Sequence, residues 1–325
     1  MLRAAVRITQ IDGKLPNLAL MRLAAFHRAR GDEIVFTRSV RHSLFEPEYT
    51  HVYGSAIFKF SAARIEKLKA AFPQAIIGGT GSGSNATVDQ YGTALDYSMY
   101  PDFDASIGFT QRGCRLSCKF CVVPQKEGKP RAEATVADIW RGPPYPKHLH
   151  LLDNDFFGAP GWQDRIAEIQ GGGFKVSFTQ GINVRAMTPE VAAAIAGIEY
   201  RDDGFQKRRL YTAWDNLKDE EVFFRGVDML EAAGVPPKNI MAYMLVGFDK
   251  RETWDRIWHR FHRMVERGIL PSPMVFDHGR RDLKAFQRWV VTGLYRAVKF
   301  EDYDVNIRSE RRARDTETLD LFAEA

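Results

Sequence analysis

The chain has 325 residues, 45% of them hydrophobic, and carries a formal net charge of +5. This length exceeds one average domain, and the hydrophobic content is typical of a globular protein with a sizeable core. No apolar run approaches the length that crosses a bilayer, and residues 1–7 do not resemble a signal peptide. We therefore expect no membrane partner, and the cysteine usage, three residues in 325, implies a reducing, cytoplasmic compartment. The small basic excess would suit a polyanionic partner, although at this size it is more often a solvated surface.

Residues 1–100 are predicted to form a small Rossmann-like or flavodoxin-like α/β domain. Strands and helices alternate in it, which implies a parallel sheet with right-handed crossovers. The expected strands are 2–8, 33–37, 51–57 and 75–77, and the expected helices run from Asn17 to Arg30 and from 62 to 72. The glycine-rich run 78–83 would either cradle a phosphate with its N–H groups or form a flexible turn. Segment 89–103 is expected to be a link.

All three cysteines lie in one stretch, Cys114, Cys118 and Cys121, spaced CxxxCxxC with Phe120 before the last. An expected strand over 104–110 leads into this loop. Three thiolates at this spacing can converge on one iron–sulfur cluster and leave one iron without a protein ligand. The odd count confined to eight residues argues against a disulfide, because it is not a secreted disulfide framework.

A structural zinc ion is the alternative metal for the cysteine loop. His148 or His150 would then supply the fourth ligand. Structural zinc sites usually pair two short knuckles of cysteine or histidine. The sequence contains no second knuckle, which favours the cluster.

The motif resembles the signature of the radical S-adenosylmethionine (SAM) superfamily, CxxxCxφC with φ aromatic. The resemblance implies a [4Fe-4S] cluster held by Cys114, Cys118 and Cys121, with SAM chelated at the open iron. A one-electron reductant of the flavodoxin or ferredoxin kind would supply the electron. In that family reductive cleavage gives methionine and a 5′-deoxyadenosyl radical, which abstracts hydrogen from substrate. The superfamily also places its cluster loop after the first strand of a barrel.

The N-terminal domain is similar to the cobalamin-binding domain in front of many radical SAM barrels. The cobalamin motif of that family, DxHxxG, is absent, because His27 lies within a predicted helix and His51 begins a strand. We therefore expect a vestigial domain and no histidine-ligated cobalamin. Cobalamin held without a protein ligand is left open.

Residues 101–300 are predicted to form an open (β/α)6 partial TIM-type barrel, the common radical SAM architecture. Six strand–helix units alternate along this region, whereas a closed barrel would need eight. The expected strands are 104–110, 147–152, 174–178, 209–214, 240–246 and 274–276. Residues 301–325 are expected to be a charged tail.

Polar residues collect at the predicted carboxyl ends of these strands, where the reactive groups of parallel barrels converge. By resemblance, the turn of Asp153, Asn154 and Asp155 takes the place of the family's Gly-Gly-Glu motif, which meets the methionyl ammonium. Further cofactor contacts are implied for the methionyl carboxylate (Arg185, with Asn183), the ribose (Asp215 or Asn216) and the adenine (Gly247 and Phe120). Each could instead be a helix cap or a turn residue.

The sequence is less informative about substrate. Tyr243, Asp277 and His278 are candidates for orienting substrate or moving protons. The absence of further cysteines excludes a second cysteine-held cluster.

A nucleotide or nucleic-acid base is the leading hypothesis for the substrate, from the basic residues beside the cysteine loop and near the barrel mouth (Lys126, Lys129, Arg131, Arg280 and Arg281). A small metabolite or amino-acid-derived substrate is the alternative. A non-catalytic iron–sulfur or zinc protein that binds nucleic acid is a third.

Overall fold

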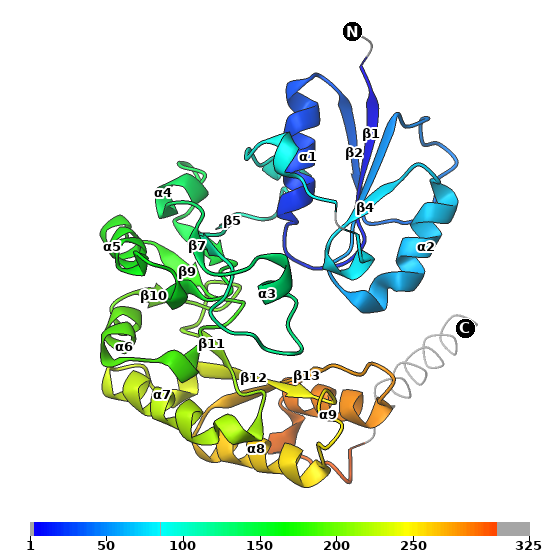
Figure 1. Cartoon of the computed structure of the whole chain (residues 1–325). Helices are drawn as coiled ribbons and strands as arrows, with labels where there is room; N and C mark the ends of the chain where they lie inside the picture. Colours follow the sequence, from blue (N-terminus) through cyan, green and yellow to red (C-terminus); the bar gives the residue numbers. More distant parts are fainter. Residues whose placement is uncertain (1–2, 85, 304–325) are drawn as a thin grey trace, which may run out of the picture. The chain divides into compact units, whose positions relative to one another are not determined.

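The computed structural model describes residues 3–84 and 86–303. The described chain forms two compact units that divide between Ser177 and Phe178, and each unit is described by itself. Both contain parallel strands connected by helices (Figure 1), so the predicted α/β class is confirmed. The predicted domain boundary near residue 100 falls inside the first unit and stays a prediction. No helix in the described part combines the length and apolar character needed to cross a membrane.

The first unit begins with a four-stranded parallel sheet in the order β2-β1-β3-β4. Its strands are β1 (Ala5–Gln10), β2 (Glu33–Thr37), β3 (His51–Ser55) and β4 (Ile76–Gly78). Their ends lie within two residues of expectation, except that β1 begins three residues later than predicted. Helices α1 (Leu18–Ala29) and α2 (Ala62–Ala71) lie on opposite sides of the sheet (Figure 1). The predicted start of this helix at Asn17 is confirmed within one residue, and Asn17 caps α1, because its side chain accepts a hydrogen bond from Leu20 N at 3.2 Å.

Alternation along β1 places Val6 and Ile8 on the same face of the sheet. Val6 and Ile8 pack with Leu20, Met21 and Ala24 of α1. On the α2 side, Ile65 and Leu68 pack in a separate cluster with β3 and β4. Burial of these side chains, at about 25 cal/mol per Å² of apolar surface, is the main stabilising term for this sheet.

Segment 89–103 contributes to this core, which the sequence did not indicate. Met99 and Tyr100 are buried against α1. The Tyr100 hydroxyl donates to Gln10 Oε1 at 3.0 Å and accepts from Asn17 N at 3.1 Å. The segment is therefore part of the N-terminal core as well as a connection.

The rest of the first unit contains a second parallel sheet in which β5 (Ser106–Gly108), β8 (His148–Leu151) and β9 (Lys175–Ser177) are consecutive neighbours. Helices α3 (Val123–Lys126), α4 (Val136–Ile139) and α5 (Trp162–Gly172) belong to the same region. A short antiparallel pair, β6 (Gln111–Arg112) with β7 (Arg131–Ala132), was not predicted.

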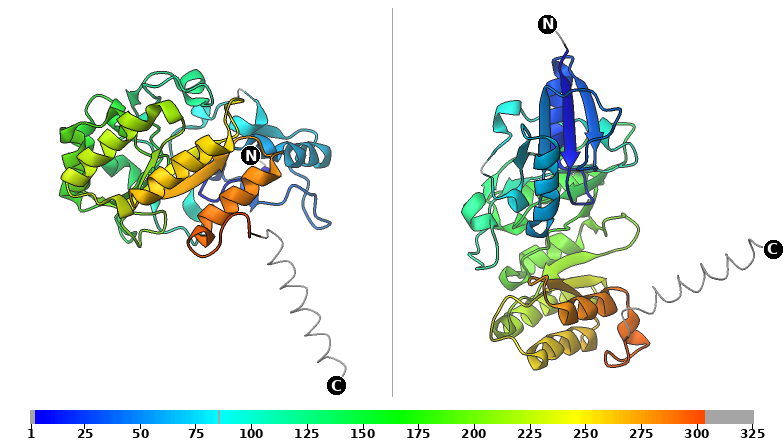
Figure 2. Two further views of the ribbon diagram at one scale, coloured as in Figure 1. Left: turned by 90° about the horizontal axis from the view of Figure 1, so that it is seen from below. Right: turned by 90° about the vertical axis from the view of Figure 1, so that its right-hand side faces the viewer.

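The second unit contains the parallel sheet β11 (Leu210–Ala213), β12 (Ile240–Val246) and β13 (Leu270–Val275). Helices α7 (Glu220–Ala232), α8 (Trp254–Glu266) and α9 (Arg281–Val291) lie on one side of it (Figures 1 and 2). The unit also includes α6 (Pro189–Ala196) and β10 (Glu199–Tyr200).

The prediction for β13 was wrong at its start, because the strand begins at Leu270 and not at 274. Pro271 and Pro273 argued against a strand there, since proline donates no ladder hydrogen bond. An edge strand tolerates proline, and β13 lies at the edge of its sheet.

Each of the six predicted barrel strands is present. Three lie in the first unit (β5, β8 and β9) and three in the second (β11, β12 and β13). The open barrel therefore stays a prediction. The tail prediction, 301–325, lies almost entirely outside the described residues.

Candidate functional site

The cysteine loop leaves β5 and is closed at its base by the β6–β7 pair, in which Arg112 faces Arg131. Cys114 N donates to Gly128 O at 3.1 Å, which joins the two sides just above this pair. Gly113 has φ +87°, and a Cβ there would clash with the Lys129 carbonyl. Glycine is therefore required where the chain enters the loop.

The three cysteines are half-buried within this loop. Cys121 N donates to Cys118 O at 3.0 Å, and Leu116 N donates to Cys114 Sγ at 3.4 Å. Burial raises the pKa of the Cys114 thiol, and the neighbouring charges of Asp155, Cys118 and Cys121 raise it further.

An open pocket of about 390 Å³ lies beside the first cysteine, within the range of small-molecule sites. Its lining includes Cys114, Arg115, Ser117 and Lys129. Across residues 3–84 and 86–303, no group of three or more histidine, cysteine or acidic side chains converges as a metal site. The donor set nevertheless fits an iron–sulfur cluster in kind, because cysteine thiolates are its usual protein ligands.

A buried carboxylate holds the first residue after Cys114. Asp155 has a side chain only 1% exposed, and it accepts two hydrogen bonds from the Arg115 guanidinium, at 2.8 and 2.9 Å. The main-chain N–H of Arg115 also donates to Asp155, at 3.1 Å. Asp155 therefore fixes both the backbone and the side chain of Arg115, the loop residue that follows Cys114.

A second carboxylate, Glu127, was not singled out from the sequence. It accepts hydrogen bonds from the Arg112 guanidinium at 2.9 Å, Gly113 N at 3.1 Å and the Asn154 amide at 3.1 Å. Glu127 thus connects both ends of the loop to the turn after β8. One indication of its role was visible in the sequence, because Glu127 is the only acidic residue between positions 112 and 131, where several residues are basic.

Asp153 lies deeper in the first unit, with only 3% of its surface exposed. One oxygen accepts from the Thr110 hydroxyl at 2.7 Å and from Gln111 N at 2.5 Å. The other, Oδ2, is buried and has no hydrogen-bond partner among the described residues. Burial raises the pKa of this carboxyl to about 6, against the lowering by these hydrogen bonds.

The predicted turn of Asp153, Asn154 and Asp155 is therefore brought to the cysteine loop and to the end of β5. Asn154 donates to Glu127 and Asp155 pairs with Arg115, whereas one oxygen of Asp153 keeps its acceptor capacity. Phe120 lies half-buried in the same loop.

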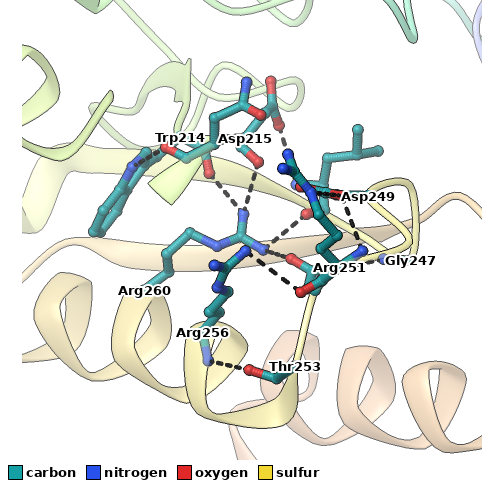
Figure 3. Close-up of polar contacts among 11 residues, drawn as sticks. Trp214, Asp215, Gly247, Asp249, Arg251, Thr253, Arg256 and Arg260 are labelled. Carbon is teal, nitrogen blue, oxygen red and sulfur yellow. Dashed lines mark hydrogen bonds and ion pairs between the residues drawn. The ribbon is translucent and has the colours of Figure 1, made fainter. Parts of the chain in front are cut away.

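In the second unit, a buried arginine organises the ends of β11 and β12 (Figure 3). Arg260 of α8 donates to the carbonyls of Trp214, Asp215 and Leu245 at 3.0–3.1 Å and pairs with Glu252. Glu252 in turn accepts from Gly247 N at 2.7 Å. The Arg260–Glu252 pair therefore supports both the Asp215 turn and the Gly247 turn.

The carboxylate of Asp215 accepts from Leu245 N at 3.0 Å. Burial raises the pKa of Asp215, with the Arg260 charge opposing that shift. Gly247 has φ +79°, and Asp277 Cβ lies 3.7 Å from the position of an added Cβ there. Asp215, Gly247 and Asp277 thus gather at the carboxyl ends of neighbouring strands, as expected for a parallel sheet.

The remaining predicted residues are placed differently. Arg185 pairs with Asp219 at 3.0 Å, and the Asn183 amide nitrogen is buried without a partner among the described residues. The Tyr243 hydroxyl donates to Thr179 O at 2.8 Å, and burial raises its pKa to about 12, so the phenol stays protonated near neutral pH. His278 is exposed on the turn after β13.

No protein-family profile matches the chain, and no curated protein matches it at a significant level.

Proposed function

We propose that the chain is a radical SAM enzyme whose [4Fe-4S] cluster is held by Cys114, Cys118 and Cys121. The observation that carries the proposal is a CxxxCxφC loop that leaves the carboxyl end of β5 and is fixed by Asp155 and Glu127. A loop built this way is preorganised, so binding the cluster costs less ordering of the chain. The open pocket beside Cys114 leaves room for a ligand next to the loop.

When bound, the cluster would pass one electron from an external reductant to SAM, giving methionine and a hydrogen-abstracting 5′-deoxyadenosyl radical. The chain's own residues would supply the three thiolates and a scaffold for the loop. SAM contacts in the second unit, at Asn183, Arg185, Asp215 and Gly247, stay predictions from the resemblance. An oxygen-sensitive cluster would suit a reducing, cytoplasmic compartment.

We further propose a nucleotide or nucleic-acid base as the substrate. Lys119, Lys126, Lys129 and Arg131 are exposed in and beside the cysteine loop. This local positive charge favours a substrate that carries phosphates, because lysine and arginine neutralise phosphate and release its counterions.

Spectroscopy on anaerobically reconstituted protein tests the chemistry. We would reduce the protein, record its electron paramagnetic resonance spectrum with and without SAM, and assay 5′-deoxyadenosine in the same sample. A cluster signal that shifts with SAM, together with 5′-deoxyadenosine, supports the proposal. A colourless protein with bound zinc and no cleavage would contradict it and would make the cysteines a structural site.

A further inference from the structure

We propose that the exposed ring pair of Phe58 and Phe60, together with lysines of the cysteine-loop segment, binds the bases and backbone of single-stranded nucleic acid. The inference rests on the proposed function for its link to catalysis, and it names the surface on which that substrate would dock. We refer to Phe58 and Phe60 as the aromatic pair.

The aromatic pair is parallel, exposed and fixed. The two rings are 4.9 Å apart between centroids with an interplanar angle of 9°. Phe58 is 42% exposed and Phe60 58% exposed, although apolar side chains of this size are usually buried. Partly exposed aromatic side chains of this kind are the features on which nucleic-acid bases stack.

Asp12 holds the backbone under this pair. Its carboxylate accepts hydrogen bonds from Ile57 N at 2.7 Å, Phe58 N at 3.0 Å and the Ser61 hydroxyl at 2.6 Å. These bonds fix the segment that presents both rings. A rigid platform loses little conformational entropy when a base stacks on it.

The pair also lies where open parallel sheets bind ligands. In the order β2-β1-β3-β4, the chain changes direction across the sheet between β1 and β3. Ligands of such folds bind beyond the carboxyl ends of the strands at this switch point. Asp12 follows β1 and Phe58 follows β3, so the two residues flank it.

A shared turn, Thr80–Ser82, joins the aromatic pair to the cysteine-loop segment. Gly81 N donates to Ala56 O at 2.9 Å, and a Cβ on Gly81 would clash with the Phe58 carbonyl. On the other side, Lys126 Nζ donates to Thr80 Oγ1 at 3.3 Å. The glycine-rich run is therefore a close-packed connection between Phe58 and a lysine of α3.

Charge complementarity identifies the partner. Residues 112–131 contain six basic side chains and one acidic side chain. Arg112 and Arg115 are paired with Glu127 and Asp155, while Lys126, Lys129 and Arg131 are exposed. Lys126, which contacts the turn that packs against Phe58, belongs to this basic segment. Cations combined with stacking rings match a polymer that carries phosphates and bases together. An uncharged metabolite would use only one of these features.

The test measures fluorescence anisotropy of labelled strands of about 20 nucleotides, which exceeds one stacking-platform site. The probes are mixed-sequence single-stranded DNA, the RNA equivalent, the DNA duplex and an abasic DNA strand with the same backbone. We expect wild type to bind single strands more tightly than the duplex or the abasic strand. Replacing Phe58 and Phe60 together by alanine should weaken single-strand binding at least about fivefold and leave abasic binding nearly unchanged.

Matched variants separate stacking from charge. Phe45→Ala removes a phenylalanine that is 95% exposed elsewhere in the unit and should change nothing. Phe58→Trp should retain or strengthen binding, because it keeps an aromatic ring at this position. Lys126→Ala and Lys129→Ala should weaken binding to every strand and should each reduce the slope of log K against log salt by about 0.7.

Equal affinity for abasic and base-bearing strands would overturn the proposal, as would a Phe58/Phe60 double alanine variant that binds like wild type. Cys118→Ala protein without a cluster should still bind single strands. Strand binding without any 5′-deoxyadenosine formation would contradict the proposed radical SAM activity but would still support the role of the aromatic pair in strand binding. Formation of 5′-deoxyadenosine without strand binding would contradict only the proposal that the aromatic pair binds single strands.

Discussion

Asp155 and Arg115 form an ion pair that links a buried scaffold residue to the cysteine loop. The Asp155 side chain is 1% exposed, whereas Arg115 is 39% exposed. Two guanidinium nitrogens and the main-chain N–H of Arg115 donate to the two carboxylate oxygens. Gly158 makes space for this carboxylate, because a Cβ at that position would clash with Asp155 Oδ2 and approach Arg115 Nε to 2.7 Å.

Asp155→Asn should lower iron incorporation into the cysteine loop while leaving the protein folded. The substitution removes the charge and replaces one acceptor oxygen by a donor, so the bidentate pair is lost. Hydrogen bonds to charged groups contribute about 1.5–3 kcal/mol, and the exposure of Arg115 places this pair toward the lower value. Iron per protein and the visible absorbance after anaerobic reconstitution check the prediction.

Two further variants control this result. Asp164→Asn changes an exposed acid of the same unit and should reconstitute like wild type. Gly158→Ala should reproduce the loss, since it displaces the same carboxylate without changing its charge. Full iron content in both Asp155→Asn and Gly158→Ala would show that the pair does not organise the loop for cluster binding.

Asp153 should make the protein less stable as pH rises from about 4 to about 6. Its folded pKa, about 6, lies above the ordinary value of 3.8, so the folded state holds the proton more tightly than the unfolded chain. The stabilisation is complete below the unfolded pKa and lost as pH rises through the folded pKa. The shift corresponds to about 3 kcal/mol, with little further change above pH 7.

Asp153→Asn isolates this contribution, because asparagine keeps an acceptor for Thr110 and Gln111 but does not titrate. Urea midpoints at several pH values should fall less between pH 4 and 7 for Asp153→Asn than for wild type. Asp164→Asn again serves as the exposed control. Parallel pH curves for wild type and Asp153→Asn would contradict the assignment.

Cys118→Ala should abolish the cluster but leave the fold intact. Cys118 is half-buried in a loop, so removing its sulfur takes away little buried surface and should lower the free energy of unfolding only slightly. With one ligand gone, two thiolates are too few for a stable site-differentiated cluster. Electron paramagnetic resonance and iron analysis measure the first effect, and circular dichroism measures the second.

Ser117→Ala, one residue earlier and exposed, is the matched control and should retain the cluster. A full cluster in Cys118→Ala would mean that another residue supplies the third ligand.

The alternation of strands and helices was predictable because it depends on local patterns. The apolar run of Ile240–Val246 and the amphipathic spacing of Trp254, Ile257 and Phe261 each identify their element without tertiary information. The cysteine spacing was likewise visible, along with its place after the strand at 106–108. The start of β13 was missed, since its prolines oppose a strand except at a sheet edge.

The long-range hydrogen-bond partners at these sites could not be predicted from the sequence. Glu127 contacts Asn154 across 27 positions, and Arg260 reaches the carbonyl of Asp215 across 45. Nothing in local composition selects these pairs, because they depend on how the elements pack. The predicted turn of Asp153 to Asp155 was found at a strand end, yet its side chains support the cysteine loop in a way that only the fold reveals.

Loss of Arg260 should destabilise the second unit strongly. The side chain is 1% exposed and serves three backbone carbonyls and Glu252, while burial lowers its pKa. Arg260→Met would leave Glu252 charged and without its buried partner. Removing one member of a buried pair typically costs about 3–5 kcal/mol. The free energy of unfolding in urea checks this value, with Arg256→Ala on the same helix expected to change it by no more than about 0.5 kcal/mol.

Glu252→Gln gives a milder test that separates stability from ligand binding. Glutamine retains an oxygen for Gly247 N or for Arg260, but it cannot serve both as a charged acceptor. If the Asp215 and Gly247 turns hold SAM as the sequence predicts, this folded variant should bind SAM several-fold more weakly. Equilibrium dialysis with labelled SAM measures that affinity under conditions where circular dichroism shows native protein. Unchanged SAM affinity in a destabilised Glu252→Gln protein would restrict the Arg260–Glu252 pair to a structural role, since the turns it supports would then not position the cofactor.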